Sequence, residues 1–341
     1  MSKYLHTPVD PPKVTDYNLS GLVQAMGKTA FQGRNVAKSV EVWQNMLEDN
    51  VTILLGLAGA MVPAGMRRII VYLIENRLID CLVATGANLF HDCHESLGRY
   101  HWQGSHLADD TALREEMVDR IYDVFASDLD FQQTDHFIAD FAAGLPQDKP
   151  YTTRHFLYLL GQELNKTGKE NGILTAAARA NVPVYCPAVG DSSIGIAMAL
   201  NRVKGKCNFQ FDVIQDVVET AQLIYKTNAS GVIYVGGGTP KNYIQQTEVT
   251  AYLMGHETQG HKYALQITAD APQWGGLSGC TFEEAQSWGK ISAKAMKVSL
   301  FADATIVLPL IVNALAEQAE ESIKNRTKPQ FKIDQAVLEV V

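Results

Sequence analysis

The stretch VTILLGLAGAMVPAG (residues 51–65) decides the fold. It opens with five β-branched or aliphatic residues and continues into a turn that contains Gly59, Pro63 and Gly65. Residues 66–76 follow with isoleucine and leucine at helical spacing. This succession predicts a buried strand, a glycine-rich turn and a helix.

Similar apolar runs recur along the chain and predict five further strands, at residues 78–85, 182–186, 231–235, 263–268 and 305–308. The runs are nearly continuous rather than alternating, which is typical of strands buried on both faces of a parallel sheet. Helical segments separate most of them. The sequence therefore predicts an open, doubly wound α/β fold with a mostly parallel sheet.

The rest of the chain suggests additions to this sheet. Two helices, about 19–26 and 34–48, predict an N-terminal helical extension over residues 1–50. The sheet domain would span 51–323 and carry a helical insertion at about 86–180, with helices at 112–126, 135–143, 154–164 and 173–180. Residues 324–341 resemble a polar C-terminal tail with a short apolar end.

Composition limits the class of protein. The chain has 341 residues, of which 46% are hydrophobic and 19% charged, and a net charge of −8 without a stretch dense in Lys and Arg, which argues against nucleic acid as a partner. Residues 1–14 lack the apolar core of a secretory signal, and the apolar runs are too short to cross a bilayer. Five scattered cysteines without a CxxC spacing favour a reducing compartment. We therefore expect a cytoplasmic protein without a membrane partner.

Glycine-rich turns follow the predicted strands, at residues 56–65, 85–88, 187–195, 236–241 and 268–279. In this class of fold ligands bind outside the carboxyl ends of the strands. Any one turn alone could be only a tight connection, but together they favour a nucleotide site, where glycines admit a phosphate to the backbone. A P-loop is excluded because Lys290 is followed by Ile291 and Glu284 stands where that motif needs glycine.

A histidine-rich segment follows the second predicted strand. His91 and His94 would share one helical face, and His101 lies nearby. A metal site usually needs a third and a fourth ligand, and no matching pair occurs elsewhere. We therefore expect a polar pocket rather than a metal site.

The segment EAQSWGKI (residues 284–291) resembles the active-site segment E-A-V-S-W-G-K-I of the deoxyhypusine synthase family, whereas a lysine after Trp-Gly would otherwise be read as a surface lysine. The resemblance covers nearly the whole chain in order. It includes residues 31–35, 65–67, 79–80, 182–195, 236–241, 298–304 and 309–310.

This resemblance implies a Rossmann-like domain, usually in a homotetramer with NAD sites at subunit interfaces. In the family NAD oxidises an amine carbon of spermidine, the lysine takes the aminobutyl group as an imine, and an acceptor amine displaces the lysine. Lys290 would be the nucleophile, accompanied by Glu284 and Trp288, and burial beside Trp288 would lower its pKa. The matching positions suggest NAD contacts from Gly59, Ala60, Met61, Val62, Pro63, Thr85, Gly86, Ala87, Asp191, Gly237, Ala269, Asp270, Asp303 and Ala304.

The chain departs from the family where the substrate amine is held. Two glutamates are replaced by Phe90 and His91, an aspartate by Ile196, a histidine by Asn242, and the aspartate of a Gly-Ser-Asp-Ser-Gly loop by Leu277. Each buried ammonium of a polyamine needs a carboxylate or an equivalent partner. The candidate substrate-binding residues are His91, Ile196, Asn242, Gly275 and Leu277.

We therefore expect an NAD-dependent transferase that moves an aminoalkyl group to or from a small amine other than spermidine. Three alternatives remain: a genuine deoxyhypusine synthase acting on a protein lysine, a homospermidine synthase, and an NAD-binding protein without turnover. The identities of the donor and the acceptor stay open.

Overall fold

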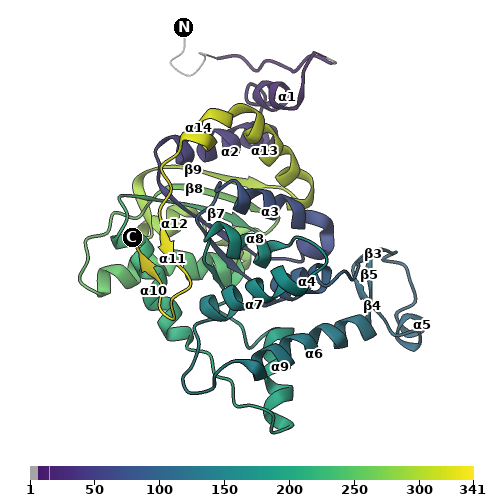
Figure 1. Cartoon of the computed structure of the whole chain (residues 1–341). Coiled ribbons are helices and arrows are strands. Elements are labelled where there is room, and N and C mark those ends of the chain that lie inside the picture. The colour runs from purple at the N-terminus through teal and green to yellow at the C-terminus, as the bar shows by residue number, and fades with distance from the viewer. Residues whose placement is uncertain (1–6, 15) are drawn as a thin grey trace.

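The computed structural model describes residues 7–14 and 16–341, and its centre is a six-stranded parallel sheet (Figure 1). The strands lie in the order β6 (Val184–Tyr185), β2 (Cys81–Ala84), β1 (Thr52–Leu57), β7 (Ser230–Val235), β8 (His261–Thr268) and β9 (Ile291–Phe301). Numbered along the chain, this order is 3-2-1-4-5-6, that of a Rossmann fold, and all neighbours are parallel. The predicted fold class is confirmed.

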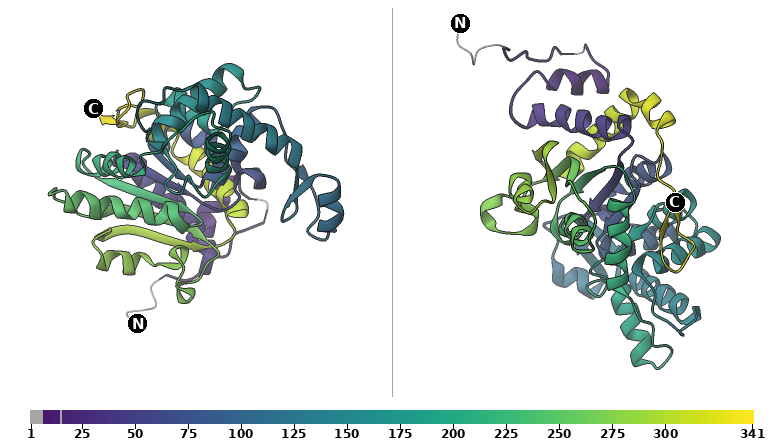
Figure 2. Two further views of the ribbon diagram at one scale, coloured as in Figure 1. Left: turned by 90° about the horizontal axis from the view of Figure 1, so that it is seen from below. Right: turned by 90° about the vertical axis from the view of Figure 1, so that its left-hand side faces the viewer.

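The strands are apolar throughout because both faces of the sheet are covered. Ile53 and Leu55 of β1 belong to one hydrophobic core, whereas Leu54 belongs to the core on the other face. The first core is completed mainly by α2 (Phe31–Glu48), α3 (Arg67–Glu75), α4 (Gly86–Ser96), α7 (Thr153–Thr167), α8 (Ile173–Ala180) and α13 (Ala304–Gln318). The second is covered by α10 (Val213–Tyr225), α11 (Gly238–Leu253) and α12 (Phe282–Ser287). Figure 2 shows these layers in two further views.

The predicted sixth strand is wrong. Residues 305–308 lie in α13, because the Asp303 side chain caps that helix by accepting a hydrogen bond from the Thr305 N–H. The sixth strand is β9, at the edge of the sheet. Its first half alternates polar and apolar residues irregularly, and only Ile291, Val298 and Leu300 are buried. The run at 305–308 was misleading because a buried helix can also be apolar over four consecutive residues.

The insertion is less helical than the sequence predicts. The expected helix at 112–126 is wrong, since α5 (Asp110–Glu115) ends early and a three-stranded antiparallel sheet replaces the rest. Its strands are β3 (Trp102–Gln103), β4 (Val118–Ile121) and β5 (Val124–Ser127). We call α5 and these three strands the arm. The arm projects from the rest of the molecule beside α4 and α6 (Asp128–Gly144), as Figures 1 and 2 show. Of the other helices of the insertion, α7 packs against β6, and α8 packs against α3, α4 and α7; α9 (Ser193–Val203), which follows the insertion, packs against α6.

The N-terminal extension has the predicted helices, α1 (Leu19–Met26) and α2, which pack against α13. The expectation that residues 1–14 form no secretory signal falls partly on residues 1–6, which lie outside the described residues. Over residues 7–14 and 16–341, no helix is long and apolar enough to span a membrane.

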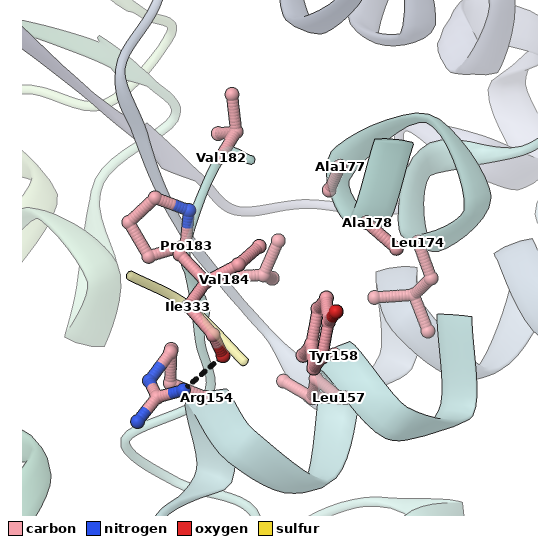
Figure 3. Close-up of a pocket in the computed structure, with 10 residues that line it drawn as sticks. All are labelled: Arg154, Leu157, Tyr158, Leu174, Ala177, Ala178, Val182, Pro183, Val184 and Ile333. Atoms are coloured by element: carbon pink, nitrogen blue, oxygen red, sulfur yellow. Dashed lines mark hydrogen bonds between the residues drawn. The ribbon is translucent and has the colours of Figure 1, made fainter. Parts of the chain in front are cut away.

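The C-terminal segment is a strap rather than a free polar tail. After α14 (Glu320–Asn325) the chain forms a short hairpin, β10 (Phe331–Lys332) and β11 (Glu339–Val340), and buries Ile333 and Leu338. Buried Arg154 pairs with Glu219 at 3.0 Å and donates to the carbonyl oxygen of Ile333 at 2.7 Å (Figure 3). The strap therefore covers the N-terminal end of α7, where Arg154 lies. Its few apolar residues are too widely spaced in the sequence to predict this packing.

Candidate active site

From β1 the successive strands are added on one side of the sheet, and from β7 they are added on the other side. The turns after β1 and β7 therefore border the crevice where ligands bind in this fold. Gly236 and Gly238 adopt φ angles of 75° and 54°, in the left-handed region that favours glycine. Gly237 between them faces the protein's own loop, because an added Cβ would come within 2.4 Å of Ser278. The close approach at Gly237 therefore holds the loop that also carries Gly275 and Leu277.

Asn88 ties together the predicted cofactor residues that follow β1 and β2. Its side-chain oxygen accepts a hydrogen bond from the Val62 N–H at 3.1 Å, and its amide donates to the Gly59 carbonyl oxygen at 2.7 Å and to Thr85 Oγ1 at 2.9 Å. Asn88 is 1% exposed. The sequence reasoning assigned it no role, although its place directly after the TGA turn was a usable signal.

A cavity of about 680 Å³ opens beside the turn after β1. Its walls come from that turn, from the arm and from the start of α13: Ala60, Pro63, Ala64, Gly65, His101, Trp102, Gln103, Gly104, Ile121, Tyr122, Asp123, Val124, Asp303 and Thr305. We call it the arm pocket. It brings together three of the predicted cofactor residues, Ala60, Pro63 and Asp303.

Other predicted cofactor residues also lie at the carboxyl ends of the strands, but after other strands of the sheet. Asp191 follows β6 and Asp303 follows β9, which are the two edge strands, about 24 Å apart at the usual strand spacing. The turn of Thr85, Gly86 and Ala87 meets the one after β6, since Gly86 packs against Ser192. Asp270 follows β8, and neither it nor Asp191 lines the arm pocket.

Lys290 directly precedes β9. It therefore lies at the amino ends of the parallel strands, whereas the predicted cofactor turns lie at their carboxyl ends. Its N–H donates to the carbonyl oxygen of Ala285 at the end of α12, and its own carbonyl oxygen accepts from the His261 N–H, both at 3.1 Å. The Lys290 ammonium nitrogen lies 5.3 Å from the Trp288 ring centre. Lys290 is only half-buried, and Trp288 is 67% exposed. The expected burial of this lysine is therefore absent in a single chain.

A second lysine, buried Lys241 on α11, holds the neighbouring loop. Its ammonium group donates to Gln266 Oε1 at 2.9 Å and to the Ser278 carbonyl oxygen at 3.3 Å. Burial lowers the pKa of Lys241 to about 8, while Cys280 and Glu284 act in the opposite direction. Lys241 was matched to the family from the sequence without a role. Its bonds indicate that it anchors the loop of Leu277 and Ser278 over the turn after β7.

The candidate substrate residues are spread over three helices and one loop. His91 lies on α4, Ile196 on α9 and Asn242 on α11, while Gly275 and Leu277 belong to the loop before α12. Ile196 and Leu277 are 56% and 48% exposed. Glu284, the candidate partner of Lys290, is also exposed. These side chains therefore do not converge on one closed pocket within a single chain.

The histidine segment forms a hydrogen-bonded cluster. His101 donates through Nδ1 to Glu95 Oε1 at 2.7 Å, and its Nε2 lies 2.9 Å from His91 Nδ1. Burial, with smaller effects of His101 and His94, lowers the pKa of His91 to about 3. Within the described ranges no three His, Cys, Asp or Glu side chains are placed to hold a metal ion.

Comparison with known proteins identifies the family. The deoxyhypusine synthase family model matches residues 21–315. The chain belongs to the deoxyhypusine synthase family. It is 53% identical to "Probable deoxyhypusine synthase 2" of Methanosarcina mazei, over 97% of this chain and 95% of that protein. It is 34% identical to a "Deoxyhypusine synthase-like protein" of Chlorobaculum parvum, over 90% of this chain and 89% of that one.

A solved structure shares the fold. It is the crystal structure of "a putative deoxyhypusine synthase from Entamoeba histolytica", with a TM-score of 0.62 and 18% identity, covering 91% of this chain and 98% of that chain. The sequence-based recognition of the family is confirmed, and the protein is a deoxyhypusine synthase-like transferase.

Proposed function

We propose that the protein is an NAD-dependent transferase that moves an aminoalkyl group through an imine on Lys290, with a small amine other than spermidine as substrate. The observation that carries this is the retention of Lys290 beside Trp288, in a family whose chemistry depends on that lysine, together with the loss of the polar residues that would hold a polyamine. Asp80 and Arg67, which also match the family, are buried and structural.

The residues around the arm pocket fit a dinucleotide. A volume of about 680 Å³ lies within the usual range for cofactor sites. One carboxylate oxygen of Asp303 caps α13, which leaves the other for a hydroxyl or an amide of the cofactor. NAD bound there would supply a hydride acceptor for an amine carbon and later return the hydride. Ala60 and Pro63 of the turn after β1 would shield it from water.

We propose that two subunits complete each active site, in a homotetramer. Lys290 lies before β9 and the arm pocket lies beyond the carboxyl ends of the strands, so one chain does not bring the nucleophile to its own arm pocket. The exposure of Trp288, Ile196 and Leu277 fits coverage by a partner. Such coverage would desolvate Lys290 and favour the neutral amine that attacks.

The domain division proposed from the sequence stays as an extension over residues 1–50, a sheet domain over 51–323 and a C-terminal segment over 324–341. The strap formed by the last segment connects it closely to α7. We propose that it stabilises the sheet domain and takes no part in the reaction.

A second candidate is transfer of the aminobutyl group of spermidine to a protein lysine, which the name of the Methanosarcina mazei relative favours. The loss of family carboxylates at Ile196 and Leu277 favours the first proposal, because each buried ammonium without a partner costs several kcal/mol.

Mass spectrometry after incubation with NAD, an amine and borohydride tests the proposal. We expect a reduced adduct on Lys290 whose mass identifies the transferred group. Lys294, an exposed lysine four residues along β9, provides the matched control: Lys294→Ala should keep the adduct and Lys290→Ala should lose it. The absence of any adduct with spermidine, putrescine, agmatine and carboxylated amines would contradict the proposal.

A further inference from the structure

The cluster formed by His91 and Glu95 of α4 with His101, just before β3, has an order that a merely polar pocket would not need. Glu95, His101 and His91 form a single chain of hydrogen bonds of 2.7 and 2.9 Å. The other carboxylate oxygen of Glu95 lies 3.4 Å from the Arg67 guanidinium, so Glu95 is fixed from behind. His101, in the middle, lines the arm pocket.

We propose that Glu95, His101 and His91 form a proton relay that takes a proton from a substrate amine bound beside the arm pocket, which His101 lines, and later returns it. This inference rests on the proposed function and deepens it, by assigning the acid–base groups that amine oxidation needs. It assigns a role in proton transfer to His101 and Glu95, and it explains why His91 stands in place of a carboxylate.

The direction of the relay follows from its hydrogen bonds. Because the Glu95 carboxylate can only accept, His101 donates to it through Nδ1. In neutral His101 the other nitrogen, Nε2, must then accept from His91 Nδ1–H. This leaves a lone pair on His91 Nε2, to which no hydrogen bond is directed among the described residues. That atom is the entry point of the relay.

The surroundings decide where the proton rests. Burial lowers the pKa values of His91 to about 3 and of His94 to about 4, so a proton is not held on either ring. Arg99 donates to Thr134 on the His94 side, and Arg67 with Glu170 lies behind Glu95. From α6 the apolar ring of Phe131 packs against all three histidines. His101 is the ring that contacts a carboxylate, that of Glu95.

The proton balance of the reaction fits this arrangement. The amine arrives as an ammonium, and His91 Nε2 takes one proton from its nitrogen. His91 passes its Nδ1 proton to His101 Nε2, so the positive charge rests beside Glu95. NAD held at the arm pocket would supply the acceptor for a hydride from the α-carbon of the neutral amine, which would become an iminium. When a hydride is returned to the product iminium, the relay gives the proton back and an ammonium leaves.

Chemical rescue tests the relay kinetically. We expect His91→Ala to slow formation of the reduced Lys290 adduct about 100-fold, a usual loss for a general base. Added imidazole should restore at least part of this rate, and 4-methylimidazole and other small bases should do so in the order of their basicity. Glu95→Gln, which keeps the hydrogen bond but removes the charge, should show a smaller loss without rescue. His136→Ala, an exposed histidine on α6, is the control and should be unchanged with or without imidazole.

Nitrogen NMR of histidine-labelled protein provides a readout that does not depend on turnover. With NAD and each of putrescine, agmatine and spermidine, we expect the amine that labels Lys290 to convert one ring of the His91–His101 pair to its cationic form, and Glu95→Gln to abolish the change. Two neutral rings throughout, or equal adduct rates in His91→Ala and the unmodified enzyme, would overturn the relay while leaving the Lys290 chemistry intact. Absence of any adduct would overturn the proposed function itself.

Discussion

The Lys290 segment and the α4 segment differ in what they retain from the family. Residues 284–291 keep the family's active-site pattern except for Gln286, whereas α4 carries Phe90 and His91 in place of two glutamates. The two segments also lie at opposite ends of the parallel strands, because the Lys290 segment precedes β9 and α4 follows β2. The difference indicates that bond formation and amine recognition can change separately, because they depend on different elements. We propose that a subunit interface joins them.

The largest effect is expected from replacing Lys290, the proposed nucleophile. Lys290→Ala and Lys290→Arg should each lower group transfer by roughly three orders of magnitude or more, as for other covalent nucleophiles. Arginine keeps the charge but does not deprotonate to attack. Steady-state assays measure the loss, and calorimetry should show NAD binding largely intact. Near-normal transfer by Lys290→Arg would exclude the covalent route.

Substrate preference tests the recognition side. Spermidine should bind poorly, because each ammonium without a partner costs several kcal/mol, roughly a thousandfold in affinity. The double variant Ile196→Asp and Leu277→Asp should raise spermidine use. Both side chains are half-exposed, so the new carboxylates should not prevent folding.

The control for this experiment is Ile214→Asp, at a more exposed position on α10, which should have no effect on the choice of amine. Assays at fixed NAD would compare spermidine, putrescine, agmatine and carboxylated amines. Micromolar affinity of the unmodified enzyme for spermidine would show that the substitutions do not exclude it.

The residues beneath Lys290 should give a pH signature of stability. Glu248 and His261 are buried 3.5 Å apart, and His261 N–H holds the Lys290 carbonyl oxygen. Burial raises the pKa of Glu248 to about 7 and lowers that of His261 to about 4. The folded state therefore binds the Glu248 proton more strongly than the unfolded state and the His261 proton less strongly, and the two effects oppose each other.

Replacing either Glu248 or His261 should reveal how the remaining residue changes the free energy of unfolding with pH. In His261→Gln, the free energy of unfolding should fall by roughly 2–3 kcal/mol as pH rises from about 4.5 to 7, because Glu248 loses its proton there. In Glu248→Gln it should instead rise between about pH 4 and 6.5, because only His261 remains. Urea titrations at several pH values measure both, and the unmodified protein should be nearly flat. Equal slopes in the two variants would contradict the coupling.

The sequence predicted the parts of the molecule that local pattern controls. The inner strands, the helices α1 and α8, and the turn after β1 follow from continuous apolar runs, caps and glycines. It missed β9, an edge strand with little apolar pattern, and the arm, whose short strands pair only with each other. Lys290 and Asp303 flank β9 and are separated by its length, so missing this strand also hid their separation. Asn88 and Lys241 acquire roles only through contacts with turns distant in the sequence.

The smallest expected effect concerns the cofactor at the arm pocket. Asp303→Asn keeps a good N-cap for α13 and removes the charge, so the protein should remain folded. NAD affinity should fall by roughly tenfold, the usual loss when one hydrogen bond to a charged group is weakened. Asp191→Asn, after the outermost strand on the opposite side, β6, should weaken NAD similarly, because we propose that both aspartates meet one dinucleotide across a subunit interface. NADP should bind poorly to the unmodified protein, because a 2′-phosphate is usually met by Arg or Lys and the polar groups nearest the pocket include Asp123 and Asp303. Calorimetric titrations of both dinucleotides provide the measurement. No detectable NAD binding at millimolar concentration, or a preference for NADP, would show that the pocket does not hold NAD and would leave only the Lys290 side of the comparison standing.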